Sequence, residues 1–526
     1  MSFSSSKSHT SMKTDPQADR VEVFAVDGSE GMEQLTGHKQ ELRVSMGLGA
    51  LIALSVANVA PTVAINGSLA TSLSSGGPVA VLWGWVAVVA ICLCIAASLA
   101  EMCSAWPHAA GQAFWAFMLA PPRYAPFLSY FTGFMNIAGG WALIAAGAWI
   151  FADGILGLAV AYNPDYVIQP WQMVVLYEVL LFLFFAVNLY IVRVLDACTK
   201  AFAVINLSSV LATIIALAAC APVKQKPSFV FGGWINETGW SNRGLVWLLG
   251  LLQSAFTMVG FEASAHLCEE AHDAARLAPI AIFGGTAVIG LVGFVWIITI
   301  LFCMGDVMGA IGSPTGIPVL QVFWDAFGLK GAAAAFMINL ILLGFAIIGI
   351  IAASSRAVWS MSRDGGFPGS TLFGKVNHKL QVPVYACLLQ VTVPALLGLI
   401  QFGSSSIFAA FFQMTTVGYM LSYAVPIALI LVRGRHHLPQ AHWRMPDTVA
   451  KACNVVSLAY IPFICVLFCI PNFYPVTGEN ANYTSAIWAG ATLICVIGWY
   501  AEVRRKFKGP ASVAHAIEAE AGSASV

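Results

Sequence analysis

The chain carries at positions 55–67 the sequence SVANVAPTVAING, an apolar stretch that one proline and two asparagines interrupt. A second interrupted stretch, at positions 256–266, reads FTMVGFEASAH and places Gly260 two residues before the ionisable Glu262. A helix in lipid must satisfy its own backbone groups, so an interruption is tolerated only where it faces protein or a water-filled cavity. We therefore predict that both stretches are broken helices that line an interior site.

The composition places these stretches in a membrane. Of the 526 residues, 59% are apolar and only 10% are charged, and the mean hydropathy is +0.80. Soluble domains are about 45–50% apolar and about 25% charged, so this chain has too little charge to solvate its surface. Lys and Arg together number 25, as do Asp and Glu, which leaves no basic excess to attract a nucleic acid.

Hydropathy along the chain predicts twelve spans, because each span needs about 20 apolar residues. The segments are 45–72, 79–103, 125–155, 171–193, 196–220, 244–268, 278–304, 331–356, 382–402, 407–431, 452–470 and 484–503. The interrupted stretches fall in the first and sixth spans, five spans apart. Paired interruptions at corresponding positions of two halves are typical of inverted-repeat transporters, whose binding site lies between the breaks.

The same pattern predicts the domain organisation of an all-α polytopic membrane protein. A polar, charged N-terminal stretch is expected to be a disordered cytosolic tail, and it lacks the apolar core of a cleavable signal peptide. The predicted parts are the tail 1–43, a transporter domain 44–503 with repeats at about 45–220 and 244–431 and two additional spans in 452–503, and a cytosolic tail 504–526.

Charges in the loops predict the orientation. With a cytoplasmic N-terminus, 21 of the 25 Lys and Arg residues lie on the inner side, as the positive-inside rule requires. The even span count then makes both termini cytoplasmic. Two N-x-S/T sequons, at Asn236 and Asn482, fall in loops on the outer side, where glycans are added. We expect a multi-pass protein of the plasma membrane, with the vacuolar membrane as the alternative.

The two breaks offer opposite backbone charges. At the first, the outer half-helix presents free N–H groups and a positive dipole end, which suit a carboxylate. The residues expected to bind there are Asn58, Ala60, Pro61, Thr62, Val63 and Ala64. At the second break, carbonyl groups near Val259 and Gly260 suit an ammonium. The sequence therefore predicts a site for a small zwitterion or amine.

Side chains near the breaks extend this site. An acid near the bilayer centre costs at least about 2.5 kcal/mol, so Glu262 is expected to gate or to couple protons. The alternative is a structural hydrogen bond from unwound backbone to its carboxylate. Aromatic faces that attract an amine are expected from Phe134, Trp141, Phe261, Tyr419 and Tyr423, although each alone fits core packing or lipid contact as well.

The twelve cysteines lie almost entirely inside apolar runs, and no CxxC pair or Cys/His cluster occurs in a polar loop. Cysteines in such surroundings behave as small apolar residues. We therefore expect neither a disulfide framework nor a metal site, and no cofactor.

Three separated motifs resemble a known family. They are EMCSAWPHAAGQ at 101–112 with LAPPRY at 119–124, GFE at 260–262 with Glu269, Glu270 and Pro279, and Arg356 with SRDGGFP at 362–368. Together they resemble the amino acid/polyamine/organocation superfamily, and more narrowly its fungal branch of choline and 4-aminobutyrate permeases. The resemblance covers about residues 40–505. It implies a LeuT-like five-plus-five fold with two additional spans, and proton-coupled secondary transport of an amine-containing solute.

The resemblance leaves the substrate open. The WPH and LAPP stretches are similar to those of choline permeases, whereas the GFExxxH run is shared with amino acid members. Many amino acid members carry a glycine-rich first break, but here Pro61 has no N–H, so one donor for a carboxylate is missing. Choline, 4-aminobutyrate, an amino acid and a polyamine all remain candidates.

Charged residues cluster at the predicted inner face. They are Glu101, Glu269, Glu270, Arg276, Arg356, Arg363 and Asp364. Opposite charges there are expected to form a closed inner gate, with solvated boundary charges as the alternative. Lys200, early in the fifth span, lies where sodium-coupled relatives of the family bind an ion, which fits proton coupling. Its alternatives are snorkelling to the interface and pairing with Asp196.

Other classes of protein fit less well. A solute sensor on a permease scaffold, which binds without transport, is the main alternative, although such sensors tend to carry longer cytosolic tails. The major facilitators place a Gly-x-x-x-Asp-Arg type loop between spans two and three, where this chain has Glu101, Pro107 and Gly111. An enzyme is not expected, because the chain holds no HExxH, GxSxG or P-loop motif.

Overall fold

The computed structural model describes residues 46–191, 195–377, 379–402, 407–478 and 480–510. Within these ranges the secondary structure is helical, with three isolated β-bridges and no sheet. The predicted tails 1–43 and 504–526 lie outside these ranges, apart from 504–510.

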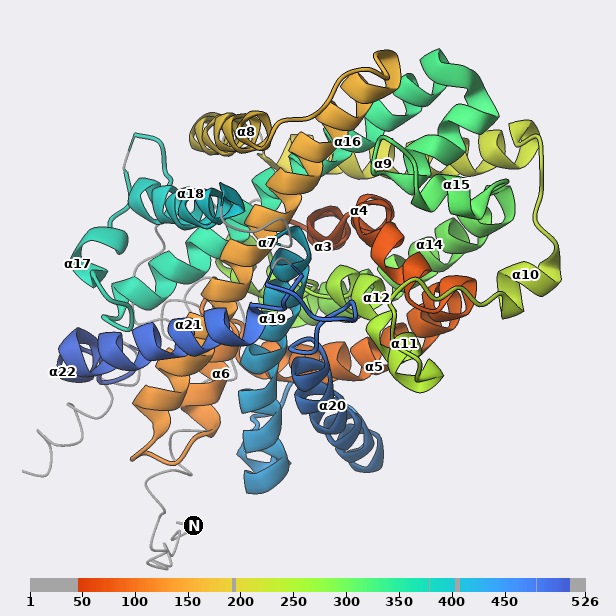
Figure 1. Ribbon diagram of the computed structural model, residues 1–526. Coiled ribbons are helices and arrows are strands. Elements are labelled where there is room, and N and C mark those ends of the chain that lie inside the picture. The colour runs from red at the N-terminus through yellow and green to blue at the C-terminus, as the bar shows by residue number, and fades with distance from the viewer. Residues whose placement is uncertain (1–45, 192–194, 378, 403–406, 479, 511–526) are drawn as a thin grey trace, which may run out of the picture.

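The helices gather into one bundle (Figure 1). The longer ones are α3 (Leu48–Val59), α4 (Pro61–Ser74), α5 (Gly77–Ala105), α7 (Ala125–Tyr162), α8 (Pro170–Ile191), α9 (Leu195–Cys220), α14 (Ala274–Cys303), α16 (Pro318–Arg363), α18 (Val384–Gly398), α19 (Ile407–Arg433), α20 (Asp447–Leu467) and α21 (Thr484–Gly498). The shorter ones are α6 (Gln112–Leu119), α10 (Pro227–Gly232), α11 (Arg243–Leu249), α12 (Leu252–Thr257), α13 (Ala263–His266), α15 (Val307–Ile311), α17 (Ser370–Phe373) and α22 (Arg504–Lys506), with a π-helical turn at Trp499–Val503.

Nine helical segments in the described ranges are long and apolar enough to cross a membrane. This confirms the prediction of a multi-pass helical membrane protein. The other three predicted spans fall on shorter pieces: the apolar part of α9 at Val204–Cys220, α18, and the interrupted run from α11 to α13. A twelve-span topology stays a prediction.

The first helical pair, α3 and α4, lies inside the bundle (Figure 1). Both helices pack against α14 on one side and against α16 on the other. The long α16 bends at Gly328, whose φ of 67° and ψ of 171° leave the helical region, and its longer part then runs past the first pair. The 38-residue α7 packs against both α16 and α19. This arrangement surrounds the interruption between α3 and α4 with protein on several sides.

Apolar side chains fill the interior. The largest fully buried ones include Trp85, Trp115, Trp296 and Trp359. Other large apolar residues are exposed, including Phe182 of α8 and Leu207 of α9. An apolar outer surface of this extent suits contact with lipid tails. The described cysteines are free thiols, and most of them are buried or half-buried.

Candidate functional site

The first interruption occurs at Ala60. Helix α3 ends at Val59, Ala60 adopts the left-handed conformation (φ 40°, ψ 63°), and α4 begins with Pro61. A left-handed alanine costs about 1–2 kcal/mol, and Pro61 cannot donate the hydrogen bond that would continue α3. The chain therefore breaks within the stretch where the sequence predicts a break.

The start of α4 keeps a donor available. The amides of Val63 and Ala64 both donate to the carbonyl oxygen of Ala60 at 3.0 Å, and Pro61 has no N–H. The amide of Thr62 has no hydrogen-bond partner among the described residues. Because the N-terminus of a helix carries a partial positive charge, this amide can donate a hydrogen bond to an anion.

The second interruption runs from Met258 to Glu262. Helix α12 ends at Thr257, Gly260 has a φ of 77°, and α13 begins at Ala263. Glycine adopts this conformation without the steric cost that other residues have. The last carbonyl groups of a helix accept no hydrogen bond from within it. The end of α12 therefore presents a partial negative charge.

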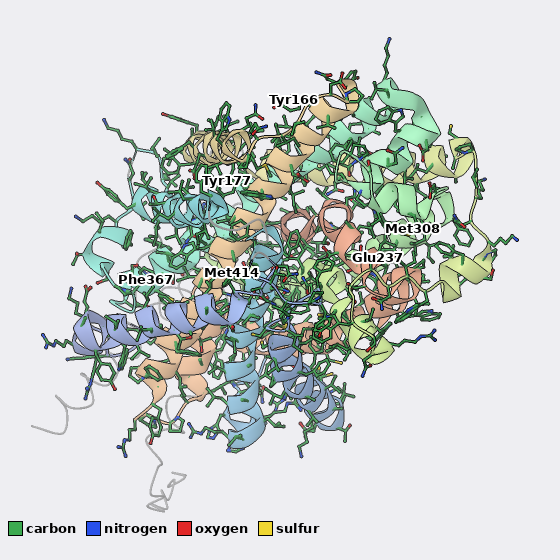
Figure 2. The ribbon with its side chains drawn as sticks, viewed as in Figure 1. Tyr166, Tyr177, Glu237, Met308, Phe367 and Met414 are labelled. Carbon is green, nitrogen blue, oxygen red and sulfur yellow. The ribbon has the colours of Figure 1, made fainter. Side chains whose placement is uncertain are left out.

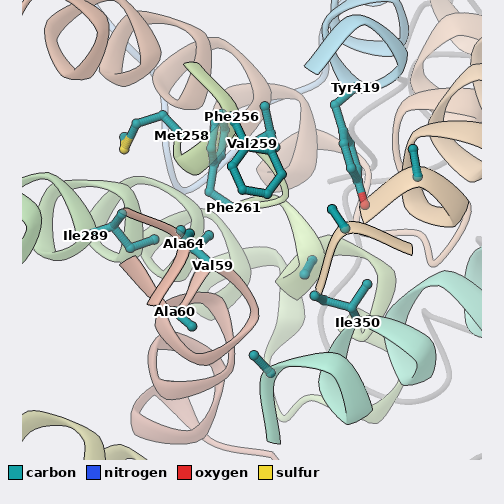
Figure 3. Close-up of a cluster of buried hydrophobic side chains, with 14 of the residues drawn as sticks. Val59, Ala60, Ala64, Phe256, Met258, Val259, Phe261, Ile289, Ile350 and Tyr419 are labelled. Carbon is teal, nitrogen blue, oxygen red and sulfur yellow. The ribbon is translucent and has the colours of Figure 1, made fainter. Parts of the chain in front are cut away.

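The two interruptions face each other across a buried apolar cluster (Figure 3). Val59, Ala60 and Ala64 approach from one side, and Val259 and Phe261 from the other. Helix α12 packs against α4, and α13 packs against α3. The positive end of α4 and the negative end of α12 therefore belong to one buried region.

Glu262 ends the second interruption, and its side chain is buried with 1% of its surface exposed. Its Oε1 accepts a hydrogen bond from Asn136 Nδ2 at 3.1 Å, and its Oε2 accepts one from the hydroxyl of Tyr423. Asn136 also donates to Ser422 Oγ at 3.4 Å. Glu262 forms no ion pair with any residue that the structure describes. Its carboxylate instead accepts hydrogen bonds from neutral donors of α7 and α19.

Tyr423 also contacts the backbone of the interruption. The amide of Gly260 donates to its hydroxyl oxygen at 3.3 Å. Its ring lies 5.6 Å from that of Phe261 and 6.1 Å from that of Tyr419, measured between centroids. The side chain of Tyr423 therefore contacts three consecutive residues of the second break: the amide of Gly260, the ring of Phe261 and the carboxylate of Glu262.

Of the aromatic residues expected at the site, Phe261, Tyr419 and Tyr423 form a connected group, and Phe134 and Trp141 of α7 form a second pair with centroids 6.1 Å apart. The indole N–H of Trp141 is buried and makes no hydrogen bond within the described part of the chain. An unsatisfied buried donor costs about 1–3 kcal/mol. A polar ligand is one way to satisfy it.

The predicted inner-face charges form two buried ion pairs. Arg363 donates to both carboxylate oxygens of Glu269 at 3.2 and 3.3 Å, and Arg356 Nε donates to Glu270 Oε1 at 2.9 Å. The guanidinium of Arg363 also lies 4.6 Å from the ring centroid of Trp359. Both pairs join the segment after α13 to the C-terminal part of α16. In the sequence, Glu269 follows Glu262 by seven positions.

Glu101 does not join these pairs. Its Oε1 accepts hydrogen bonds from Arg435 and from the amide of Met445 at 3.3 Å, and Arg435 also binds Asp447. Glu101 therefore ties the end of α5 to the segment between α19 and α20. Sequence analysis did not identify Arg435 as the partner of Glu101, and the gating roles of Glu101 and Arg363 stay predictions.

Other predicted residues stand apart from the site or outside the description. The side chains of Asn58 and Lys200 are not among those described, so their predicted roles stay predictions. Asn236 is exposed, whereas Asn482 is half-buried and donates from Nδ2 to the carbonyl oxygens of Phe468 and Ile470 at 2.8 and 2.9 Å. No group of three or more potential metal ligands occurs in the described ranges.

Sequence reasoning missed Asn136 and Ser422, and it treated Tyr423 only as an aromatic face. A signal was present for Asn136, because it is an amide inside a long apolar run, and polar groups at such depth are costly unless they have a partner. No comparable signal identified Tyr423 as the partner of Glu262.

Known proteins are similar to this chain over most of its length. The amino acid permease family model matches residues 46–493. A putative amino acid/polyamine transporter of Macrophomina phaseolina is 32% identical over 440 residues, which are 83% of this chain and 97% of the relative. The choline transporter of Saccharomyces cerevisiae is 31% identical over 89% of this chain and 83% of its own length. Amino-acid permease BAT1 of Arabidopsis thaliana is 28% identical over 94% of this chain and 98% of its own length.

Proposed function

The chain belongs to the amino acid permease family, and we propose that it is a secondary-active, proton-coupled transporter of a small amine-containing solute. The solute is an amino acid, 4-aminobutyrate or choline, and transport proceeds by alternating access. Relatives named as amino acid, amino acid/polyamine and choline transporters support this range of substrates.

One observation carries the proposal: two helix interruptions face each other across a buried apolar cluster, and a buried carboxylate lies at the second interruption. Breaks at Ala60 and at Gly260 lie in the first and sixth predicted spans, as inverted-repeat transporters require. Glu262 lies directly at the second break. In this proposal the chain has a LeuT-like five-plus-five arrangement over 45–220 and 244–431, with additional spans in 452–503.

The backbone charges suggest how the solute binds. The amide of Thr62 and the positive end of α4 attract a carboxylate if the solute has one. The carbonyl groups at the end of α12 and the faces of Phe261 and Tyr419 attract its ammonium. Because Pro61 removes one donor, the site favours the ammonium more strongly than the carboxylate.

Glu262 is the group that takes up the coupling proton in this proposal. A proton that binds or leaves changes the local charge by one unit, and the neutral donors around Glu262 do not offset that change in a region of low dielectric constant. A carboxylate in such a position is sensitive both to protons and to a nearby cationic solute.

The inner ion pairs fit a closed inner gate. Arg356 and Arg363 hold Glu270 and Glu269 across the segment after α13, so opening on that side separates buried charges. With the positive-inside orientation, this end faces the cytoplasm, both termini are cytoplasmic, and the glycan acceptors lie outside. The plasma membrane is the proposed location.

Uptake in cells that lack their own permeases tests the proposal. Labelled choline, 4-aminobutyrate and a mixed set of amino acids are offered at acidic and at slightly alkaline pH, with Glu262→Gln as the variant and the empty vector as the control. We expect uptake of one of these solutes, faster at acidic pH, and its loss in the variant at unchanged surface expression.

Two outcomes contradict the proposal. Binding of a solute to membranes without uptake supports the alternative of a non-transporting sensor on a permease scaffold. Uptake that is equal at both pH values and in both proteins removes proton coupling and the role of Glu262.

A further inference from the structure

Tyr423 joins the ionisable group of the site to the backbone of the second break. Its hydroxyl donates to Glu262 Oε2 and accepts the hydrogen bond from the amide of Gly260. A phenol has a single proton to donate. The two hydrogen bonds therefore run in one direction: the Gly260 amide donates to Tyr423, and Tyr423 donates to the Glu262 carboxylate.

The described side chains that contact the Glu262 carboxylate both donate hydrogen bonds to it. Asn136 Nδ2 donates to one oxygen and Tyr423 to the other. An ionised carboxylate accepts at both oxygens, whereas a protonated one carries an O–H that itself needs an acceptor. The observed arrangement thus satisfies the ionised form of Glu262 at both oxygens.

A proton on Glu262 weakens this arrangement. Hydrogen bonds to an ionised carboxylate are roughly twice as strong as neutral ones, so the bonds from Asn136 and Tyr423 lose this charge assistance when Glu262 becomes neutral. The added O–H also needs an acceptor of its own, and if that acceptor is the Tyr423 oxygen, the hydroxyl proton of Tyr423 must turn away from Glu262.

The hydroxyl is firmly placed. Tyr423 is fully buried between Phe261 and Tyr419. Its helix α19 contacts α7 at a glycine pair, where a methyl carbon on Gly139 would lie 2.9 Å from the backbone nitrogen of Tyr419. Asn136 lies one turn before this contact, so both donors approach Glu262 from helices at a fixed separation.

The surroundings contain few other titratable groups. Tyr419 faces Glu262 from α19 together with Tyr423. His266, one turn further along α13, has its Nδ1 at 2.8 Å from the carbonyl oxygen of Ala109. The arginines of α16, which packs against α13, are held by Glu269 and Glu270. In the described ranges no basic side chain competes with Tyr423 for Glu262.

We propose that Tyr423 is the positioning residue that transmits the protonation state of Glu262 to the backbone of the α12–α13 break. When Glu262 is ionised, the Tyr423 hydroxyl holds both the carboxylate and the Gly260 amide. When Glu262 is protonated, its hydrogen bond with Tyr423 loses the charge of the carboxylate and weakens, so α19 holds the unwound segment less firmly. This inference rests on the proposed proton-coupled transport.

The test compares pH profiles of uptake in the full-length protein. Tyr423→Phe removes the hydroxyl and keeps the ring packing. The ionised form of Glu262 then loses one donor, so protonation occurs at higher pH, and we expect the midpoint of the uptake profile to rise by about one pH unit. A purely structural role would lower the rate at every pH without moving the midpoint.

Incorporation of 3-fluorotyrosine at position 423 provides a nearly isosteric second variant, which serves if Tyr423→Phe does not reach the surface. The more acidic phenol donates a stronger hydrogen bond to the carboxylate, so the midpoint is expected to fall below that of wild type. If Tyr423→Phe raises the midpoint of the uptake profile and 3-fluorotyrosine lowers it, the Tyr423 hydroxyl is the group that sets this midpoint.

Tyr177→Phe is the matched control. Tyr177 of α8 is equally buried, and its hydroxyl donates to the carbonyl oxygen of Pro394 in α18 at 2.7 Å. Figure 2 shows Tyr177 close to α18 and apart from Met414 of α19. This variant loses one buried hydrogen bond without touching the second break, and it is expected to keep the wild-type midpoint.

The outcomes separate this inference from the proposed function. If both changes at position 423 leave the midpoint unchanged while Glu262→Gln abolishes uptake, Tyr423 has no transmitting role and the proposed function stands. If wild type itself shows no pH dependence, proton coupling fails, and this inference fails with it.

Discussion

Gly418 of α19 lies against Gly139 of α7 so closely that a methyl carbon on Gly418 would be 2.7 Å from the Gly139 Cα atom. The same methyl carbon would lie 2.8 Å from two ring atoms of Trp488 in α21. Real side-chain carbons do not approach other atoms this closely, so α19 can occupy its place only because both residues are glycines.

Replacement of Gly418 by Ala is therefore expected to separate α7 from α19. Overpacking of an interior typically costs about 1–3 kcal/mol. Because Asn136 and Tyr423 hold Glu262 from these two helices, the variant is expected to lose uptake and to unfold at lower temperature in detergent. Unchanged uptake and unchanged unfolding would show that the contact is not needed for the site.

Gly260 permits a test of backbone conformation alone. A methyl carbon there would lie 3.6 Å from Leu143 Cδ2, an ordinary contact, but the φ of 77° is unfavourable for alanine. Gly260→Ala is expected to cost about 1–2 kcal/mol and to reduce uptake. The measurements are thermal unfolding and initial uptake rate.

Gly284→Ala is the matched control for that variant. Gly284 lies inside α14, and nothing approaches its added methyl carbon within 4 Å. Alanine is favoured over glycine by about 1 kcal/mol in a helix, so this variant is expected to be as stable as wild type or more so. Equal losses in both variants would argue against a special role for the conformation of Gly260.

The Glu269–Arg363 pair predicts a charge-reversal result. Arg363→Glu is expected to cost about 3–5 kcal/mol, because the buried ion pair with Glu269 is lost and two buried carboxylates then lie together. The double variant Glu269→Arg with Arg363→Glu restores an opposite pair and is expected to recover part of the surface expression and uptake. Lack of any recovery would show that the stack of Arg363 on Trp359, rather than the ion pair, is decisive.

An exposed pair gives the contrast for that experiment. Lys506 and Glu502 are 48% and 31% exposed and lie one helical turn apart. Exposed pairs of this spacing contribute about 0.3–0.5 kcal/mol, so Lys506→Ala is expected to be nearly silent in both measurements.

Glycan mapping distinguishes the two outer sequons. Asn236 is exposed, and its amide nitrogen donates to one backbone carbonyl, that of Trp240, at 2.8 Å. Asn482 is half-buried, and its amide nitrogen caps the end of α20 through two backbone carbonyls. We expect Asn236→Gln to abolish the mobility shift on deglycosylation. Asn482→Gln is expected to keep the shift and to lower stability, since the cap is lost. A glycan attached to Asn482 would contradict this assignment, and one mapped to 369–377 would contradict the orientation.

Both helix breaks could be predicted from the sequence because their causes are local. Pro61 lacks the N–H that a continuous helix needs, and Gly260 adopts a conformation that few other residues tolerate. Apolar runs likewise predicted the helical membrane protein, since the length of an apolar segment alone decides whether it can cross lipid.

The partners of Glu262 could not be predicted in the same way. Asn136 lies 126 positions from Glu262 and Tyr423 lies 161 positions from it, so their contact depends on how α7 and α19 rotate against the second break. Rotation is set by close packing such as the Gly139–Gly418 contact, which leaves no periodic signal in the sequence. The partner of Glu101, Arg435, escaped prediction for the same reason.

Transport driven by a proton gradient in vesicles that contain only the purified protein tests the central claim most directly. An inward proton gradient is imposed at equal solute concentration on both sides, and labelled solute is followed in wild type and in Glu262→Gln. We predict that wild type accumulates solute above the external concentration, that a protonophore abolishes this accumulation, and that the variant does not accumulate solute. Equal internal and external concentrations in wild type under the gradient, or accumulation by Glu262→Gln that matches wild type, would contradict the account.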